Sequence, residues 1–209
     1  MNYSFKIEST NISKRYQNDW IFKNLSFDLS NSESLSITGK NGSGKSTLIK
    51  CLLGLIQINN GEIIYKKNDN LIVPENWYLN LSFAAPYLEL PEEFTLKELL
   101  NFHFKFKSPF EGISIEEIIS KLYLEENRNK KISQFSSGMK QRLKLGIAFF
   151  SNSNVIFLDE PTSNLDINGF HWYLKLVEIY KENRILIIGS NEPKEYSFCK
   201  KNINIDNFK

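Results

Sequence analysis

The chain has 209 residues, of which 41% are hydrophobic and 24% charged, a composition typical of a globular protein rather than a disordered one. This length fits one large domain, or a main body with a subdomain. Lys and Arg number 26 against 24 Asp and Glu, so the formal net charge of +2 gives no reason to expect a nucleic-acid partner.

The cysteine content and the hydropathy of the sequence indicate the kind of cellular compartment in which the protein works. The two cysteines, Cys51 and Cys199, form neither a disulfide framework nor a zinc-binding spacing. The segment MNYSFKIEST lacks the apolar stretch of a secretory signal, and no run approaches the roughly 18 apolar residues that span a bilayer. The sequence therefore predicts a soluble protein of a reducing compartment that reaches a membrane only through a partner.

Short apolar runs alternate with polar turns over the first forty residues and predict a small antiparallel β region. We expect its last strand, residues 35–38, to lead into a glycine-rich loop, followed by a helix over about 45–55. Further strands are expected over residues 61–65 and about 78–84.

Residues 86–150 are mostly helical in pattern. Thr95 with Glu98, and Ser114 with Glu117, each match a capping box, in which a hydroxyl and a carboxylate satisfy the free amides at a helix start. The sequence thus places two helix N-termini in this part of the chain.

After residue 150 the alternation of strands and helices resumes. The continuous apolar run VIFL predicts a strand covered on both faces, and a helix over about 168–183 and the strand ILIIG follow. The pattern indicates a single domain over 1–209, with an α/β body of residues 1–85 and 151–209 and a helical subdomain of residues 86–150.

The segment GKNGSGKS fits the pattern G-x-x-x-x-G-K-[S/T] between a predicted strand and a predicted helix, the context of a phosphate-binding loop. Its glycines let successive N–H groups turn toward phosphate oxygens, and the helix that follows adds partial positive charge. Lys45 can reach the β- and γ-phosphates, and the Ser46 hydroxyl can ligate Mg²⁺. Nucleotide binding is predicted for Gly39, Lys40, Asn41, Gly42, Ser43, Gly44, Lys45, Ser46 and Thr47.

The VIFL run ends in two adjacent carboxylates, Asp159 and Glu160. The carboxyl end of a strand in an α/β sheet faces the ligand crevice. We expect Asp159 to hold Mg²⁺ and Glu160 to orient and polarise the water that attacks the γ-phosphate. A solvated acidic turn is the alternative, and the phosphate-binding loop makes it the weaker interpretation.

Together these segments resemble the ATP-binding subunit of ABC transporters along nearly the whole chain. FSSGM at 135–139 resembles the family signature LSGGQ, and PTSNLD at 161–166 resembles the segment after the catalytic glutamate. Tyr16 stands where the family places an aromatic residue that stacks on adenine. The resemblance implies an α/β P-loop NTPase of ABC type, with an N-terminal antiparallel β region, a mostly parallel core sheet flanked by helices, and a helical subdomain.

The resemblance also implies cofactors and partners. Ser136, Ser137 and Gly138 would begin a helix whose N-terminus closes over ATP held by a second subunit, and a plain helix cap is the weaker alternative. The chain would be a Mg²⁺-dependent ATP hydrolase that drives transport through a separate integral-membrane subunit. It would lie on the cytoplasmic face of the cell membrane, paired with its own copy or a related ATPase subunit, without nucleic acid.

The sequence departs from the family pattern in three places, and the first two, which remove groups that position water and the γ-phosphate, predict slow hydrolysis. Asn191 stands where the family usually has a histidine, and its amide can hydrogen-bond a phosphate oxygen but cannot titrate. The glutamine of the family's Q-loop would fall near residues 84–86, where the sequence has no Gln. In the signature, Ser137 replaces a glycine and Met139 replaces a glutamine.

Two other functions stay open at this point. One is a soluble ABC-type ATPase of DNA maintenance or translation, although such relatives usually carry a long coiled coil or two cassettes. The other is a nucleotide switch that barely hydrolyses ATP. Near the expected Q-loop, Tyr87, Leu88 and Phe104 could form an apolar socket for a helix of the membrane subunit, or simply belong to the core.

Overall fold

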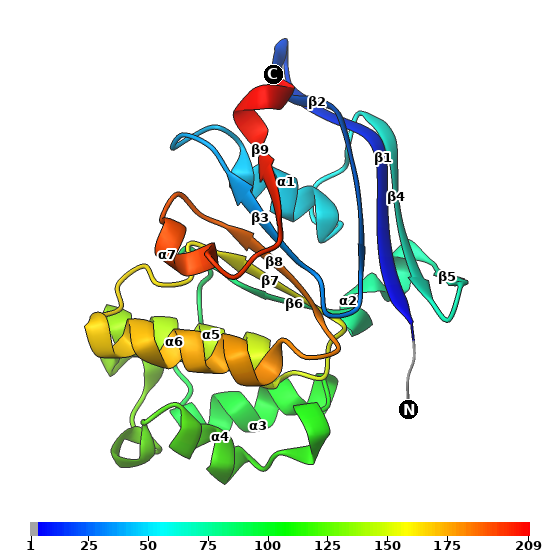
Figure 1. Cartoon of the computed structure of the whole chain (residues 1–209). Coiled ribbons are helices and arrows are strands. Elements are labelled where there is room, and N and C mark those ends of the chain that lie inside the picture. The colour runs from blue at the N-terminus through cyan, green and yellow to red at the C-terminus, as the bar shows by residue number, and fades with distance from the viewer. Residues whose placement is uncertain (1–3) are drawn as a thin grey trace.

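The computed structural model describes residues 4–209, which form two sheets and a layer of helices (Figure 1). One sheet is antiparallel in the order β2-β1-β4-β5, and the other is parallel in the order β6-β7-β8-β3-β9. The antiparallel strands are β1 (Phe5–Tyr16), β2 (Asp19–Ser30), β4 (Asn60–Lys67) and β5 (Asn70–Ile72). The parallel strands are β3 (Ser34–Thr38), β6 (Leu81–Ala84), β7 (Val155–Asp159), β8 (Ile185–Gly189) and β9 (Lys201–Asn204).

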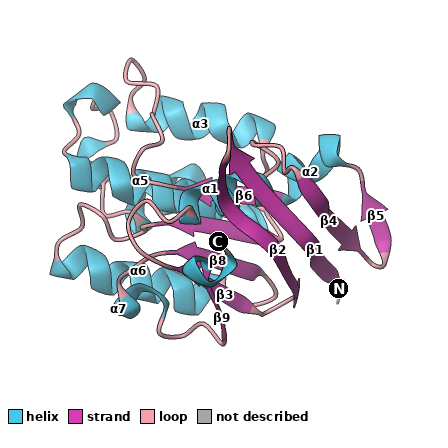
Figure 2. Cartoon of the chain, turned by 90° about the horizontal axis from the view of Figure 1, so that it is seen from above, coloured by secondary structure: helices cyan, strands magenta, loops and turns pink. Residues whose placement is uncertain are grey.

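Helices occupy both sides of the parallel sheet, with α3, α5 and α6 on one side and α1 on the other, next to the antiparallel sheet (Figure 2). The helices are α1 (Lys45–Leu52), α2 (Trp77–Asn80), α3 (Leu96–Phe106), α4 (Ile115–Lys121), α5 (Ser137–Phe150), α6 (Ile167–Tyr180) and α7 (Pro193–Tyr196). Short 3-10 turns are η1 (Pro74–Asn76), η2 (Phe110–Gly112), η3 (Glu125–Asn127), η4 (Ile132–Gln134) and η5 (Ile205–Phe208). None of the helices in residues 4–209 has the length and apolar character to cross a bilayer.

The side chains of β7 show how one strand serves two cores. Ile156 and Leu158 belong to the core shared with α3 to α6, whereas Val155 and Phe157 belong to the core shared with α1 and the antiparallel sheet. All four side chains are fully buried. The prediction of a strand covered on both faces is confirmed, and its buried end fixes the position of its last residue, Asp159, and of Glu160, which follows directly.

Both predicted capping boxes are confirmed. The Thr95 hydroxyl accepts from the Glu98 amide at 3.3 Å and the Ser114 hydroxyl accepts from the Glu117 amide at 3.2 Å, while each glutamate carboxylate returns to the cap residue's amide. Such a cap contributes about 1 kcal/mol to helix stability. The sequence therefore located the starts of α3 and α4 correctly.

Two sequence predictions about strands are wrong in part. Residues 35–38 do not close the antiparallel region, because β3 lies inside the parallel sheet between β8 and β9. Residues 78–84 are not one strand, since α2 forms first and only Leu81–Ala84 pair with β7. Both segments do contain a strand. The sequence did not reveal which strands they pair with, because those partners are distant in the chain.

The C-terminal segment holds a strand that the sequence did not predict. Strand β9 pairs with β3 from Leu35 opposite Lys201 onward, although its residues are mainly polar. The turn η5 that follows lies against the glycine-rich loop, where Asp206 Oδ2 accepts from the Lys40 amide at 3.0 Å. The end of the described chain thus supports the loop after β3.

Candidate functional site

The glycine-rich loop of residues 39–47, called the phosphate loop below, connects β3 to α1. Gly44 has φ of +114°, and a Cβ there would come within 2.2 Å of Ile21 Cγ2, so only glycine fits. Helix α1 begins at Lys45, and no side chain of residues 4–209 caps it. Its first amides are therefore free to bind an anion.

Lys45 turns its ammonium group into the phosphate loop. The side chain is 5% exposed, and Nζ donates to the carbonyl oxygens of Gly39 at 2.9 Å and Lys40 at 3.2 Å. Nearby, the Ser43 hydroxyl is buried and has no hydrogen-bond partner within residues 4–209. A buried cation beside an unsatisfied hydroxyl is the environment that a phosphate group would complete.

Asp159 ends β7 beside this loop and is 1% exposed. Its Oδ2 accepts from the Tyr87 hydroxyl at 2.8 Å, while its buried Oδ1 has no partner in the described part of the chain. An unsatisfied carboxylate oxygen fits a hard divalent cation such as Mg²⁺, which takes few protein ligands and completes its shell with phosphates and water. Residues 4–209 contain no group of three or more His, Cys, Asp or Glu side chains that could hold a metal ion by themselves.

Glu160 follows with its backbone in the left-handed region, at φ of +44°. Its amide donates to the Gly189 carbonyl at 2.8 Å, which ties the strained residue to the end of β8. The exposed side chain faces a cavity of about 400 Å³ that Asn41 and Asn191 also line. Asn191 Nδ2 donates to Asn41 Oδ1 at 2.6 Å, so the residue predicted at the histidine position does contact the phosphate loop.

Glu195 is a residue near the site that sequence analysis missed. It is 2% exposed and accepts from the Thr162 amide at 2.9 Å, the Thr162 hydroxyl and the Ser190 hydroxyl. It therefore joins the segment after Glu160 to the segment after β8. A single glutamate in a short helix matches no motif, so only the fold reveals this role.

The signature residues lie on the other side of the segment 161–166. The Ser136 hydroxyl accepts from the Met139 amide at 3.2 Å and caps α5, as predicted. Gly138 lets the helix start approach Asn164, whose carbonyl oxygen would be 3.0 Å from a Cβ at Gly138. Ser136, Ser137 and Gly138 line a cavity of about 450 Å³ that shares no lining residue with the cavity at Glu160.

Tyr16, the residue predicted to stack on adenine, ends β1. Its ring is 46% exposed, and Lys14 Nζ lies 4.9 Å from the ring centroid. An exposed aromatic ring beside a cation can accept a flat base, and the stacking role stays a prediction.

Comparison with known proteins decides the family. A family model described as ABC transporter matches residues 22–163. The cytochrome c biogenesis ATP-binding export protein CcmA of Wolbachia pipientis wMel is 31% identical over 97% of each chain. The uncharacterised ABC transporter ATP-binding protein YcbN of Bacillus subtilis is 27% identical over 90% of this chain and 62% of its own length. A solved ABC transporter ATP-binding protein of Pyrococcus furiosus, 26% identical, has a TM-score of 0.81 and coverage of 97% and 98%.

The chain belongs to the ABC transporter family. It is an ATP-binding subunit with the P-loop fold of this family, so the predictions of family, fold and ATP-binding role are confirmed. In this ABC ATPase the phosphate loop leads into α1, whereas the signature begins α5. Figure 1 shows these two helices in different parts of the molecule.

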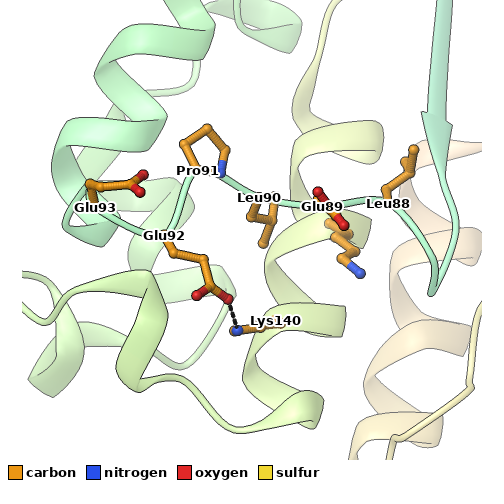
Figure 3. A pocket seen from close by; sticks show the side chains of 8 residues that line it. Leu88, Glu89, Leu90, Pro91, Glu92, Glu93 and Lys140 are labelled. Carbon is orange, nitrogen blue, oxygen red and sulfur yellow. Dashed lines mark hydrogen bonds and ion pairs between the residues drawn. The ribbon is translucent and has the colours of Figure 1, made fainter.

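The three residues considered for either an apolar socket or the core, Tyr87, Leu88 and Phe104, have different surroundings in this ABC ATPase. The Tyr87 hydroxyl turns to Asp159, and the Phe104 ring packs against the core around α3 to α6. Leu88 instead begins a groove of about 780 Å³ (Figure 3). This groove, called the acidic groove below, is lined by Leu88, Glu89, Leu90, Pro91, Glu92, Glu93, Lys140 and Lys144.

The chemistry of Tyr87 follows from its surroundings. Burial raises the pKa of the phenol above its ordinary value, and the neighbouring Asp159 carboxylate raises it further. The hydroxyl therefore stays protonated and acts as a hydrogen-bond donor at neutral pH.

Proposed function

We propose that this ABC ATPase hydrolyses ATP with Mg²⁺ and drives transport through a separate membrane subunit. The observation that supports the proposal is that the phosphate loop with Lys45 follows β3, and Asp159 and Glu160 end and follow β7, at the same edge of one parallel sheet, next to the uncapped start of α1. In open α/β sheets this edge is where ligands bind.

Each side chain has a distinct task in this proposal. Lys45 donates to phosphate oxygens in place of the Gly39 and Lys40 carbonyls, and the amides of the phosphate loop donate alongside it. Ser46 and Asp159 would hold Mg²⁺, which when bound neutralises phosphate charge. A carboxylate oxygen of Glu160 orients the attacking water and accepts its proton.

The proposal includes slow hydrolysis. Asn191 reaches the phosphate loop through Asn41, yet an amide cannot share a proton with the γ-phosphate as an imidazole can. The position near residues 84–86 provides no glutamine amide. Loss of such positioning groups costs rate rather than binding, because they act mainly in the transition state.

We further propose that two chains enclose ATP. The start of α5 has no acidic residue in its first turn, and its exposed Ser136 and Ser137 face a cavity separate from Glu160. A helix start without negative charge favours an anion. A second copy, or a related ATPase subunit, would supply this half of the site across a two-fold axis.

We treat residues 1–209 as a single domain, with a body of residues 1–85 and 151–209 and a helical subdomain of residues 86–150. We propose that the helical subdomain couples ATP hydrolysis to transport. The acidic groove lies in this part. Glu92 is paired with Lys140 within the groove, so Glu89 and Glu93 are the carboxylates that favour a partner helix with Lys or Arg side chains. The chain would then sit peripherally on the cytoplasmic face of the cell membrane. The Wolbachia relative is named an export protein, which supports a transport role without fixing the cargo.

Hydrolysis is tested by comparing three chains in the presence of Mg²⁺: the natural protein, Lys45→Ala and Glu160→Gln. Phosphate release should fall at least 100-fold in Glu160→Gln while ATP binding persists, because removal of a general base spares the ground state. Lys45→Ala should lose binding as well. Equal background rates in all three would contradict the hydrolase and favour a nucleotide switch.

A further inference from the structure

The first turn of the phosphate loop, residues 40–43, is held from outside by the C-terminal segment. The Ser43 amide donates to the Lys40 carbonyl at 3.0 Å and closes the turn. Asp206 Oδ2 accepts from the Lys40 amide at 3.0 Å, and Lys209 Nζ donates to the Ser43 carbonyl at 2.6 Å. In Figure 1 the turn η5, in red, lies beside the loop between β3 and α1. Both ends of the turn thus have a partner 166 positions away in the chain.

Apolar packing and a hydrogen bond fix η5 against the phosphate loop. Ile205 is fully buried in the core shared with α1, and a Cβ at Gly39 would lie 2.8 Å from its Cγ2. The same Cβ would lie 3.2 Å from Asp206 Oδ2, so any larger residue at Gly39 would push η5 away from the loop. Asn204 Oδ1 accepts from the Asp206 amide at 3.0 Å and caps η5. The Asp206 carboxylate is therefore held in place before a ligand arrives.

The phosphate loop loses internal support when nucleotide binds. In the free chain Lys45 Nζ donates to the carbonyl oxygens of Gly39 and Lys40. Under the proposed function the same ammonium moves to phosphate oxygens, because a charged oxygen is a stronger acceptor than a carbonyl. The start of the loop then depends more on contacts made from outside, and the bond from the Lys40 amide to Asp206 is one of them.

The Asp206 carboxylate supports the phosphate loop without blocking its ligand site. It accepts the hydrogen of the Lys40 amide, so this amide is committed to the protein rather than to phosphate. No side chain of residues 4–209 caps α1, so the carboxylate leaves the amides at the start of that helix to the nucleotide. A loop whose shape is fixed before binding loses less conformational entropy when it closes on phosphate. The contact therefore favours nucleotide binding.

We propose that Asp206 is a positioning residue that holds the first turn of the phosphate loop in its phosphate-binding shape, both in the free chain and in the nucleotide complex. The proposal rests on the proposed function, since it takes ATP as the ligand. Asp206 acts through the Lys40 amide and does not itself bind phosphate. Its loss should weaken nucleotide binding without changing the number of sites per chain.

The first test measures affinity and stoichiometry. Calorimetry of a non-hydrolysable ATP analogue with Mg²⁺ compares the natural chain with Asp206→Ala, Asp206→Asn and the control Asp28→Ala, whose side chain is 85% exposed. Asp206→Ala should bind about tenfold more weakly, because the first amide of the turn loses its acceptor. Asp206→Asn keeps an oxygen that accepts the same hydrogen and should stay within about threefold of the natural chain. Asp28→Ala removes the same charge and should bind as the natural chain does.

The same titrations separate positioning from three other roles. Tighter binding by Asp206→Ala would show that the carboxylate competes with phosphate, and would overturn the proposal. Equal weakening in Asp206→Ala and Asp206→Asn would trace the effect to charge rather than to the hydrogen bond, which also overturns it. A smaller number of sites per chain at unchanged affinity would reveal a folding defect and no positioning.

The second test asks whether the contact lasts through the nucleotide complex. Hydrogen exchange of the Lys40 amide, followed by NMR of lysine-labelled protein, should be slow in the natural chain with and without the analogue. In Asp206→Ala the same amide should exchange about tenfold faster in both states, and Asp206→Asn should restore much of the protection. A Lys40 amide that becomes fast when the analogue binds to the natural chain would contradict the proposal.

Failure of this inference differs from failure of the proposed function. If the natural chain binds the analogue and Asp206→Ala binds it equally well, positioning by Asp206 is wrong while ATP binding stands. If no chain gives heat with any nucleotide, the proposed function itself fails.

Discussion

The phosphate loop and the signature segment are both suited to bind an anion, but they differ in how many of their polar groups already have partners within the chain. Both place a glycine at a helix start, which favours an anion, and the signature segment also lines a cavity. Several polar groups of the phosphate loop already have partners in the chain. The Lys45 ammonium donates to the Gly39 and Lys40 carbonyls, and the Asp206 carboxylate accepts from the Lys40 amide. The signature segment has only its own cap, Ser136, and faces solvent.

This difference shows what one chain can do alone. The phosphate loop has the charge to bind nucleotide within a single chain. The signature residues Ser136, Ser137 and Gly138 offer a helix start and hydroxyls but no charged side chain, so we expect them to add to a site whose charged groups come from elsewhere. Variants should therefore separate binding, which depends on the first region, from association, which depends on the second.

The largest effect is expected from Lys45→Ala. Loss of a charged hydrogen-bond donor to phosphate should weaken ATP affinity of the isolated chain about 100-fold. Calorimetry with the exposed helix α6 variant Lys175→Ala as control measures this, and the control should bind as the natural chain does. Comparable losses in both variants would show that overall charge, rather than the phosphate loop, governs binding.

The side of the molecule that carries the signature should be sensitive to acid. Burial, with a smaller contribution from Lys107, lowers the pKa of His103 to about 4 from its ordinary 6.5. Between these values the unfolded chain takes up the proton first, so the free energy of unfolding should fall as pH drops from 6.5 to 4. We expect a loss of about 2 kcal/mol after allowance for partial exposure.

Urea unfolding at pH 7 and pH 4.5 measures this change. In His103→Gln the amide can still donate to Ser151 Oγ, which accepts from His103 Nε2 at 2.9 Å because its own hydrogen goes to the Ile147 carbonyl. The variant should lose less stability in acid than the natural chain. An identical pH dependence in both chains would place the acid-sensitive group elsewhere.

Glu195 connects the two regions through the segment that separates their cavities. Glu195→Gln should lower the free energy of unfolding by about 1–2 kcal/mol, since a neutral amide makes weaker hydrogen bonds to Thr162 and Ser190 than a carboxylate does. Glu192→Gln, an exposed position in the same turn, is the matched control. Equal free energies of unfolding for the two variants would contradict a stabilising role for the Glu195 carboxylate.

The smallest change in stability is expected from Ser136→Ala. Loss of the cap on α5 should cost about 1 kcal/mol of unfolding free energy and leave ATP affinity of the single chain unchanged. ATP-dependent association, followed by light scattering, should nevertheless weaken. Ser114→Ala removes a comparable cap from α4 and should lower stability without affecting association.

The sequence predicted the parts of the site that are built locally. The phosphate loop, the carboxylates after β7, and the capped starts of α3, α4 and α5 each depend on residues within a few positions of one another. Contacts that join distant segments were missed, because no local pattern encodes them. Tyr87 meets Asp159 across 72 positions, Asp206 meets Lys40 across 166, and the polar strand β9 is defined only by its pairing with β3.

The central claim is that ATP lies between the phosphate loop of one chain and the signature of another, and mixing two defective chains tests it directly. In a Glu160→Gln background, one chain carries Lys45→Ala and the other Gly138→Asp. A mixed pair then contains one intact site, made of the second chain's phosphate loop and the first chain's signature. Sedimentation with ATP and Mg²⁺ should show a dimer in the mixture and only monomers of each chain alone. A mixture that stays monomeric while the parent Glu160→Gln chain dimerises would contradict the claim.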